Sequence, residues 1–487
     1  MITQEVLDTY EMTIGIECHV QLATATKLFS GADNDARDAL PNSVTNPIDF
    51  GLPGMLPVLN REAVTLAIKA GKALNAEIAH VSRFDRKHYF YPDLPKGYQT
   101  TQLYQPIIVG GHVDAPLEDG TTVTVRIHHA HMEEDAGKLT HFGDFSLVDL
   151  NRAGTPLIEI VSEPDIHSAV AAKAYAAELH RLMTYAGVTR GDLYHGNMRF
   201  DVNISVAPKG TTELGTRAEV KNLNSFRSVE RAAEYEFRRQ VELLESGERI
   251  VQETRGWDDA KQKTSSQRSK EDAQDYRYMP DADIPPIVLD KEHIADIQAT
   301  VPHLPPYYRE VWRESGFNQD IIDALLLSQS SARLVERIRT QSSPAIAKRV
   351  GFWFLKAVSR ELDADPAVQT NPVEIPDQHF IDLATMVEDG KLNSNAGDAV
   401  FFDMLRTSES PMAIAERLNL IQESDESAIA AIVDRVLADP GSAQAVKDLQ
   451  AGNDKVIGFL VGQVMKQSQG KANPALAQKL IREKIGQ

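Results

Sequence analysis

The stretch TIGIECHVQL, residues 13–22, decides how the N-terminal part of this chain folds. Apolar and polar residues alternate along it, which is the period of a β-strand with one face in a core and the other face open. Ile14 and Cys18 belong to the apolar set, whereas Glu17 and His19 belong to the polar set. The alternation predicts a strand that carries a carboxylate and an imidazole side by side, as metal ligands or as part of a solvated face.

Two later stretches repeat this alternation with charged residues on the polar side. Residues 199–206 read RFDVNISV and residues 217–221 read RAEVK, so Asp201 lies on one polar face while Arg217 and Lys221 lie on another. Polar faces that carry both signs of charge predict a large open sheet whose exposed side binds a ligand. An antiparallel sheet with one solvated face is the alternative, and the pattern alone does not separate the two.

A run of histidines and carboxylates, HHAHMEEDAGK, occupies residues 128–138. Its three consecutive carboxylates, Glu133, Glu134 and Asp135, repel one another unless water or a cation separates their charges. Oxygen and imidazole nitrogen donors suit divalent cations. The run therefore indicates either a metal site or a solvated acidic turn.

A segment rich in cations and aromatic rings, RFDRKHYFYPDLPKGYQ, covers residues 83–99 and includes Lys87 and Lys96. Cations bind phosphates and rings stack on bases, so this composition favours contact with a nucleotide or a phosphate. Its Pro and Gly residues predict a loop. The P-loop, dinucleotide-binding, serine-hydrolase and HExxH motifs are absent from the sequence, so any ATP site is of a less common kind.

Length and composition are those of an ordinary globular protein. The 487 residues suffice for about three domains, and 42% hydrophobic with 25% charged residues excludes long disorder. The 51 basic and 70 acidic residues give a net charge of −19, which disfavours DNA as a partner and RNA binding through a broadly basic surface.

Neither a signal peptide nor a transmembrane stretch is present, so we expect a cytoplasmic protein without a membrane partner. The single cysteine, Cys18, excludes a multi-cysteine zinc site.

Helical spacing replaces strand alternation after the proline-rich segment 280–286, and a second break lies at 408–411. Before the first break we expect strands and long loops, interrupted by helices over 61–75 and 168–185. The sequence thus predicts an α+β chain with a β-rich domain and flanking helices over 1–292, an all-α domain over 293–408 and a small helical tail domain over 409–487.

Charge reverses its sign at the C-terminal end. Residues 451–487 hold six basic and two acidic side chains, a local charge of +4 in a chain whose total is −19. Lys455, Lys466 and Lys471 are among these bases. Such a reversal favours a phosphate-binding end, with a solvated helical face as the alternative.

Five strings carry a resemblance to a known family. They are GLPGMLPVLN at 51–60, FDRKHYFYPD at 84–93, HMEEDAGK at 131–138, VDLNRAGTPLIEI at 148–160 and GFLVGQVM at 458–465. Together they resemble the GatB subunits of the aspartyl/glutamyl-tRNA amidotransferases, and the resemblance runs from Ile14 to the last expected helix. It implies a β-rich cradle domain, a helical domain and a small helical tail domain, in agreement with the two breaks.

The resemblance also implies the reaction. A partner amidase subunit releases ammonia from glutamine, and this subunit uses ATP and magnesium to phosphorylate the side-chain carboxylate of Glu-tRNA(Gln) or Asp-tRNA(Asn). Ammonia then displaces the phosphate and leaves Gln-tRNA(Gln) or Asn-tRNA(Asn) for translation, so the chain belongs to an ATP-dependent carbon–nitrogen ligase. A small third, bracing subunit joins the other two in a heterotrimer. The tail domain, with Lys455, Lys466 and Lys471, contacts the outer part of the tRNA.

The resemblance assigns roles residue by residue. Magnesium and kinase positions correspond to Glu17, His19, Glu133, Glu134 and Glu159. Positions lining the ammonia path correspond to Lys87 and Lys96, and the residues expected to take part in catalysis are Glu134, Lys87, Lys96 and Glu159. Phosphate or acceptor-end contacts are expected from Arg152, Asp201, Arg217, Lys221 and Arg255.

The chain departs from the family at its cysteines. Many members carry paired cysteines where this sequence reads FSGA at 29–32 and NPID at 46–49, so we expect no zinc. Cys18 faces the apolar side of its strand and is expected in the core, not as a nucleophile. Two other functions stay open: a metal-dependent nuclease or phosphohydrolase that uses the same Glu and His side chains, and a tRNA-binding scaffold with solvated carboxylates.

Overall fold

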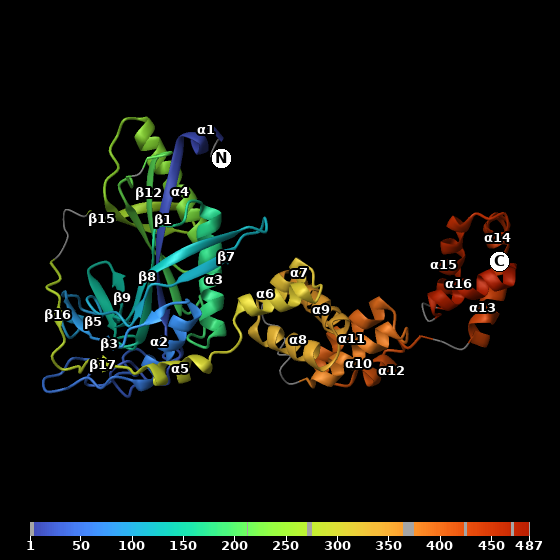
Figure 1. Cartoon of the computed structure of the whole chain (residues 1–487), viewed down its shortest axis with the longest axis horizontal. Coiled ribbons are helices and arrows are strands. Elements are labelled where there is room, and N and C mark those ends of the chain that lie inside the picture. The colour runs from blue at the N-terminus through green and yellow to red at the C-terminus, as the bar shows by residue number, and fades with distance from the viewer. Residues whose placement is uncertain are drawn as a thin grey trace. The chain divides into compact units, whose positions relative to one another are not determined.

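The computed structural model describes residues 4–211, 213–269, 275–363, 375–422, 426–468 and 472–486. It consists of two compact units, Met1–Pro305 and Pro306–Gln487. Strands are concentrated in the first unit, and the described part of the second unit is helical (Figure 1). The α+β class predicted from the sequence is confirmed.

A large sheet forms the centre of the first unit. Its ten strands are β1 (Tyr10–Gln21), β2 (Glu77–Ile78), β6 (Ile108–Val109), β7 (His112–Pro116), β8 (Thr122–Glu134), β11 (Pro156–Ser162), β12 (Met198–Pro208), β13 (Ala218–Leu223), β14 (Glu253–Asp258) and β15 (Lys263–Ser269). Their order is β15-β14-β13-β12-β1-β11-β8-β6-β2, with β7 paired to β8. Both neighbours of β1 run antiparallel to it, whereas β13 and β14 are parallel.

Helices accompany this sheet in the first unit. They are α1 (Gln4–Thr9), α2 (Arg61–Ala73), α3 (Ala169–Tyr185), α4 (Phe226–Glu245) and α5 (Lys291–Ala299). Helices α2 and α3 confirm the predictions for 61–75 and 168–185. The side chains of Asn60 and Ser168 cap their first turns by accepting hydrogen bonds from backbone N–H groups.

The sequence does not predict helix α4, because charged residues dominate its surface. Its buried residues include Val229, Ala233, Phe237 and Val241, which repeat every four positions and form a narrow apolar stripe. Helices α3 and α4 contact each other, and both contribute to the same apolar core as the large sheet. They therefore cover the apolar face of the sheet.

The alternation predicted for residues 13–22 is confirmed in β1. Ile14 and Cys18 are fully buried on the helix-covered side, whereas Glu17 and His19 are partly exposed. Cys18 is thus a core residue, as expected. The opposite face of the sheet is left free for polar side chains.

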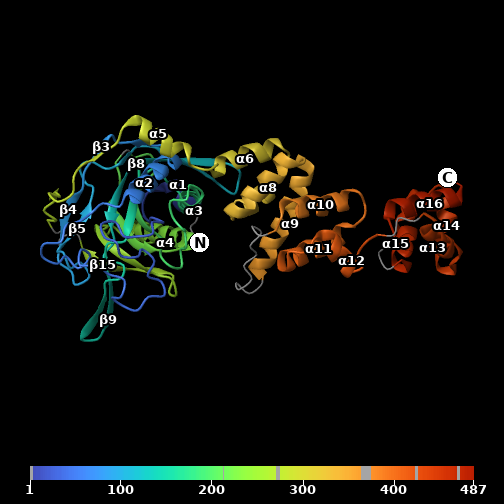
Figure 2. The same ribbon diagram turned by 90° about the horizontal axis from the view of Figure 1, so that it is seen from below.

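Smaller β-elements flank the large sheet. They are β3 (Val81–Ser82), β4 (Asp85–His88), β5 (Tyr98–Thr101), β9 (Lys138–Phe142), β10 (Phe145–Asp149), β16 (Met279–Pro280) and β17 (Ile287–Val288). Part of the segment 83–99, which the sequence predicts as a loop, forms β4, and β4 pairs with β5 and β16. Strands β9 and β10 form a hairpin that extends away from the other elements of the first unit (Figure 2).

The second unit is built from helices. They are α6 (Pro305–Glu314), α7 (Gln319–Leu325), α8 (Gln329–Gln341), α9 (Pro344–Asp363), α10 (Asp377–Glu388), α11 (Ser394–Thr407), α12 (Pro411–Arg417), α13 (Glu426–Ala438), η3 (Pro440–Ser442), α14 (Ala443–Gln450), η4 (Asp454–Val456), α15 (Ile457–Gln467) and α16 (Pro474–Ile485). The last helices share an apolar cluster of their own, which includes Ile429, Val433, Leu460 and Ile481. None of the helices within the described ranges combines the length and apolar character that crossing a bilayer requires.

The boundary between the two units lies at Pro305, later than residue 292, where the sequence places it. Helix α5 packs on α2, and Ile294 joins the apolar core of the first unit. The first unit therefore ends in the proline cluster 302–306, because the apolar face of α5 packs into the core of the first unit.

Candidate active site

The open face of the large sheet carries a cavity of about 460 Å³. Side chains from β1, β8, β11, β13 and β14 reach it because alternate residues of each strand point to this face. Strands β4 and β5 supply further walls. The cavity is lined by Glu17, His19, Lys87, Gln99, Glu133, Glu159, Glu219, Lys221, Thr254, Gln267 and Tyr276.

One group of metal-ligand type, here called the first cluster, consists of His19, Glu133 and Glu159, whose ligand atoms lie within 4.8 Å of one another. His19 faces Glu159 across β1 and β11, with 3.8 Å between Nε2 and Oε2. Nε2 of His19 lies 3.5 Å from Oε1 of Glu133. On β8, His131 faces Glu159 from the other side, with 3.1 Å between Nε2 and Oε2. An imidazole and two carboxylates form a donor set that suits a divalent cation.

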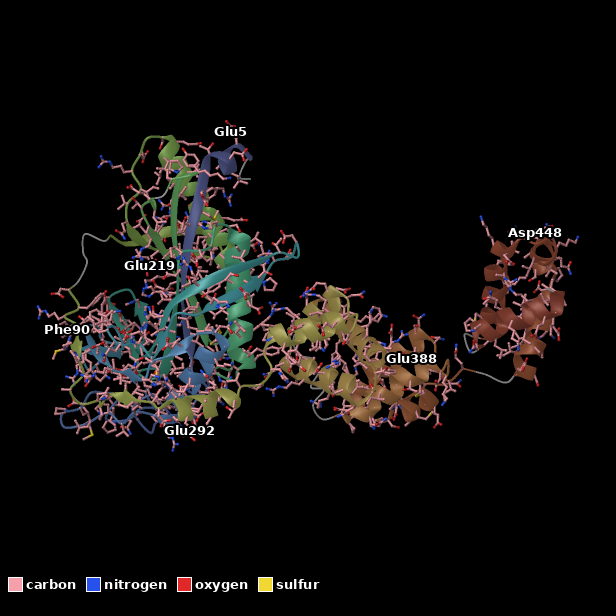
Figure 3. The ribbon with its side chains drawn as sticks, viewed as in Figure 1. Glu5, Phe90, Glu219, Glu292, Glu388 and Asp448 are labelled. Atoms are coloured by element: carbon pink, nitrogen blue, oxygen red, sulfur yellow. The ribbon has the colours of Figure 1, made fainter. Side chains whose placement is uncertain are left out.

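A second cluster consists of Glu17, Asp201 and Glu219. Glu17 and Asp201 are opposite each other on β1 and β12. Glu219, which Figure 3 labels in the first unit, belongs to β13. Nζ of Lys221 lies 3.1 Å from Oδ2 of Asp201 and 2.9 Å from Oε1 of Glu219. Asn203 donates a hydrogen bond of 2.9 Å to Glu17. A single ammonium thus offsets part of the charge of three carboxylates.

Burial and charge shift the pKa values in this cavity. Burial raises the pKa of Glu17, and the carboxylates of Glu159 and Glu219 raise it further. Burial acts to lower the pKa of His131, but hydrogen bonds to Glu133 and Glu159 outweigh it and raise the pKa to about 10. Burial acts to raise the pKa of Glu159, but the hydrogen bond with His131 and then the charge of His131 outweigh it and lower the pKa. Negative charge around Glu17 is therefore less well compensated than around Glu159.

Glu134 belongs to neither cluster. It follows Glu133 on β8, so its side chain points to the other side of the strand. There it forms an ion pair with Lys96, whose side chain is 11% exposed, and accepts a hydrogen bond of 3.0 Å from the backbone N–H of Thr100. Gln99, which lines the cavity, donates to the backbone carbonyl of Glu134 at 2.9 Å. The structure therefore separates Glu134 from the other four residues predicted as metal ligands.

Lys87 projects from β4 into the cavity. Its ammonium lies over the ring of Tyr276, 4.9 Å from the ring centroid. Burial acts to lower the pKa of Lys87, but the nearby Tyr278, Glu133 and Glu159 outweigh it and raise the pKa. Lys87 is therefore a cation at neutral pH and faces the first cluster.

The predicted phosphate or acceptor-end contacts lie in different places. Asp201 and Lys221 belong to the second cluster and its immediate surroundings. Arg217 is exposed and lines a smaller pocket of about 220 Å³ that also borders Glu17. Arg152 lines a third pocket, of about 290 Å³, and donates to two backbone carbonyls after β8 at 3.0 and 2.7 Å.

Arg255 is turned away from the cavity. Its neighbour Thr254 lines the cavity, so Arg255 points to the opposite face of β14, toward α4. There its Nε lies 3.0 Å from Oε1 of the fully buried Glu236, and it forms a second ion pair with Glu253. The structure thus places Arg255 in the core under α4, and its guanidinium is not free to bind a phosphate.

The tail lysines differ in their surroundings. Lys455 on η4 and Lys466 on α15 are exposed, and neither makes an ion pair with another described residue. Lys471 lies outside the described residues. The other bases of residues 451–487 each pair with a carboxylate, and they are Lys479, Arg482 and Lys484.

Sequence reasoning missed two members of the site. Glu219 stands on the polar face of residues 217–221, between Arg217 and Lys221, the two residues of that face expected to bind phosphate. His131 lies in the histidine run 128–138 and holds Glu159 in place. Alternation along each strand was a signal for both, but it does not say which strands become neighbours.

Carboxylates, imidazoles and lysines that converge in a cavity on one open sheet face define the first unit as a domain of catalytic type. The family model described as the GatB/GatE catalytic domain matches residues 12–295. A second model, described as the GatB domain, matches residues 333–485. The chain belongs to the GatB family of aspartyl/glutamyl-tRNA(Asn/Gln) amidotransferase subunits.

Curated relatives are B subunits of such amidotransferases, and the similarity extends over their whole length. The B subunit of the aspartyl/glutamyl-tRNA(Asn/Gln) amidotransferase of Persephonella marina is 43% identical over 475 residues, which cover 97% of this chain and 99% of the relative. The protein of the same name from Polynucleobacter asymbioticus is 45% identical over 494 residues, covering 98% and 100%. That from Halorhodospira halophila is 45% identical over 479 residues, covering 98% and 99%.

Proposed function

We propose that this chain activates the side-chain carboxylate of Glu-tRNA(Gln) or Asp-tRNA(Asn) with ATP and then exchanges the phosphate for ammonia. The names of the curated relatives support this activity. The observation that carries the proposal is that the first cluster, Lys87, and Glu17 and Glu219 of the second cluster all line one cavity. We assign the chain to the cytoplasm, where translation consumes aminoacyl-tRNA.

The second cluster consists of carboxylates and fits magnesium, which prefers oxygen ligands and binds phosphate oxygens at the same time. The first cluster adds the imidazole of His19 to two carboxylates, a donor set that suits divalent cations more generally. In this proposal His19, Glu133 and Glu159 hold one ion, and the second cluster holds another. When bound, magnesium offsets phosphate charge so that a carboxylate can approach the γ-phosphate. His131 orients Glu159, and Asn203 orients Glu17, through the contacts described above.

The pocket of about 220 Å³ beside Glu17 offers the nucleotide a position next to the second cluster. Its lining includes Gly15, Ser205 and the exposed Arg217. Gly15 places no side chain in this pocket, and the Arg217 guanidinium suits a phosphate oxygen. We infer that the nucleoside lies in this pocket and that the triphosphate extends across the second cluster into the cavity.

Glu134 and Lys96 lie on the other side of β8 from the cavity, so we assign them to the delivery of ammonia, and amide formation to the cavity itself. In water ammonia is mostly ammonium, and only the neutral form has the lone pair that attacks a carbonyl carbon. Glu134 is positioned to accept the proton of an incoming ammonium, while Lys96 holds its carboxylate in place. The neutral nitrogen then bonds to the activated carbon, the bond from that carbon to the phosphate oxygen breaks, and the proton that the nitrogen loses leaves with the phosphate as hydrogen phosphate.

Partners complete the reaction in this proposal. An amidase subunit releases ammonia from glutamine, and a small third, bracing subunit joins the two in a heterotrimer. Exposed lysines of the tail, Lys455 and Lys466, bind phosphates of the tRNA and add affinity while the first unit carries out the chemistry.

The test is magnesium-dependent ATP hydrolysis by the assembled complex with glutamine withheld. We expect turnover with Glu-tRNA(Gln) but not with uncharged tRNA(Gln), and a loss of about tenfold or more in Glu17→Gln. The matched control is Glu248→Gln, which changes an exposed carboxylate after α4. ATP hydrolysis at the same rate with charged and uncharged tRNA(Gln) would favour a phosphohydrolase. A complex that binds tRNA but does not hydrolyse ATP would favour a scaffold.

A further inference from the structure

The ammonium of Lys87 is held by aromatic rings. Within the described parts of the chain it makes neither a hydrogen bond nor an ion pair, although it lines the cavity beside the first cluster. Its Nζ lies 4.9 Å from the ring centroid of Tyr276 and 5.9 Å from that of Tyr89. The two rings meet edge to face, with 6.1 Å between their centroids.

Tyr276 is anchored against the strand that carries Lys87. The backbone N–H of His88 donates to the carbonyl of Tyr276 at 2.8 Å, and Met279 pairs with Arg86 as β16 joins β4. Arg277 has a φ of 43°, which is uncommon for a residue other than glycine, and His88 Nδ1 lies 3.0 Å from its carbonyl oxygen.

Ion pairs on the opposite side of β4 also hold the segment that carries Tyr276 against this strand. Nε of Arg86 lies 2.9 Å from Oδ2 of the buried Asp281, and the same guanidinium lies 2.7 Å from Asp283. Arg86 and Lys87 are consecutive, so they point to opposite sides of β4. Arg86 thus ties the segment 276–283 to the strand while Lys87 points into the cavity under Tyr276.

We propose that Tyr276 is a positioning residue for Lys87, which it holds over the cavity so that the ammonium can bind the side-chain carboxylate of the aminoacyl-tRNA. This inference rests on the proposed function. An aromatic face attracts a cation without accepting its N–H bonds in the way a carboxylate does. The three donors of Lys87 therefore stay available to an anionic substrate, and the ring fixes where they point.

The first experiment compares Tyr276→Phe, Tyr276→Leu and Tyr91→Leu in the assembled complex, with Glu-tRNA(Gln), ATP and glutamine. Phe keeps the aromatic face, so we expect a kcat within about threefold of the parent, whereas Leu lowers kcat about tenfold. The KM for Glu-tRNA(Gln) stays unchanged, because tRNA phosphates supply most of the affinity. Tyr91 is half exposed and touches Tyr89, and no cation among the described residues lies over its ring, so Tyr91→Leu is the matched control.

The second experiment is a double-mutant cycle with Lys87→Ala. If Tyr276 acts through Lys87, then adding Tyr276→Leu to Lys87→Ala costs less than about twofold, although Tyr276→Leu alone costs about tenfold. If the fold losses of kcat in the two single variants multiply in the double variant, the two residues act independently. That result would overturn the inference and leave the proposed function standing. So would a Phe variant as poor as the Leu variant. An active Lys87→Ala complex would overturn both the inference and the proposed role of Lys87.

Discussion

Glu17 on β1 lies directly opposite Asp201 on β12, so two carboxylates are paired across neighbouring antiparallel strands. Like charges in this position destabilise a sheet. Lys221 offsets part of the repulsion, and burial with nearby carboxylates still raises the pKa of Glu17. The strands therefore hold an arrangement that a divalent cation would stabilise.

Glu219→Gln is expected to raise the magnesium concentration that half-saturates ATP turnover, by about tenfold or more. The change removes one ligand charge from the second cluster but keeps the shape of the side chain. A magnesium titration of tRNA-stimulated ATP hydrolysis by the complex measures it, with Glu248→Gln as control. An unchanged titration would remove Glu219 from the metal site.

Glu134→Gln is expected to separate amide formation from ATP consumption. Loss of the proton acceptor should lower amide formation about 100-fold, while ATP hydrolysis stimulated by Glu-tRNA(Gln) stays within about threefold. Amide formed and phosphate released are measured in the same reaction. If both fall together, Glu134 contributes to activation and not to amide formation.

Arg255→Leu is expected to destabilise the first unit by about 1.5–3 kcal/mol, because it removes one of the two guanidinium groups that pair with the buried Glu236 and leaves only Arg239. Hydrogen exchange of β14 and β15 measures the loss where it occurs. The exposed Arg227 on α4 provides the control Arg227→Leu. Unchanged exchange, combined with weaker ATP binding, would restore Arg255 as a phosphate contact.

Lys27→Met is expected to cost about 3–5 kcal/mol of stability as well. The Lys27 side chain is fully buried, and its Nζ lies 3.2 Å from Oδ2 of Asp49 in the long loop between β1 and α2. The double variant Lys27→Met/Asp49→Leu removes both charges and should recover part of the loss. Thermal unfolding of the complex measures both, with the exposed Lys72→Met as control. A double variant less stable than the single one would contradict this account.

Lys455→Ala and Lys466→Ala are each expected to reduce the slope of log affinity for tRNA against log salt by about 0.7–0.9. Lys479→Ala should change it less, because Lys479 lies near Glu426 and Glu483. Binding at several salt concentrations gives the slopes. Equal slopes for all three variants would argue against tRNA contacts at Lys455 and Lys466.

Sequence patterns predicted the elements better than their relationships. Alternation over 13–22 predicted β1 with both of its faces, and the helices expected over 61–75 and 168–185 correspond to α2 and α3. The sequence did not predict helix α4, because its few apolar residues, spaced four apart, lie among many charged residues. Glu133 and Glu134 looked equivalent in the sequence, yet consecutive strand residues point to opposite sides.

The sequence by itself determined the family, the α+β class and which residues face away from the core, because period and local composition are properties of neighbours along the chain. Only the tertiary structure decided that Glu219 joins Glu17 and Asp201, and that Arg255 is committed to Glu236. Strand order and register bring together residues far apart in the chain, and those contacts depend on how the whole sheet and its helices pack.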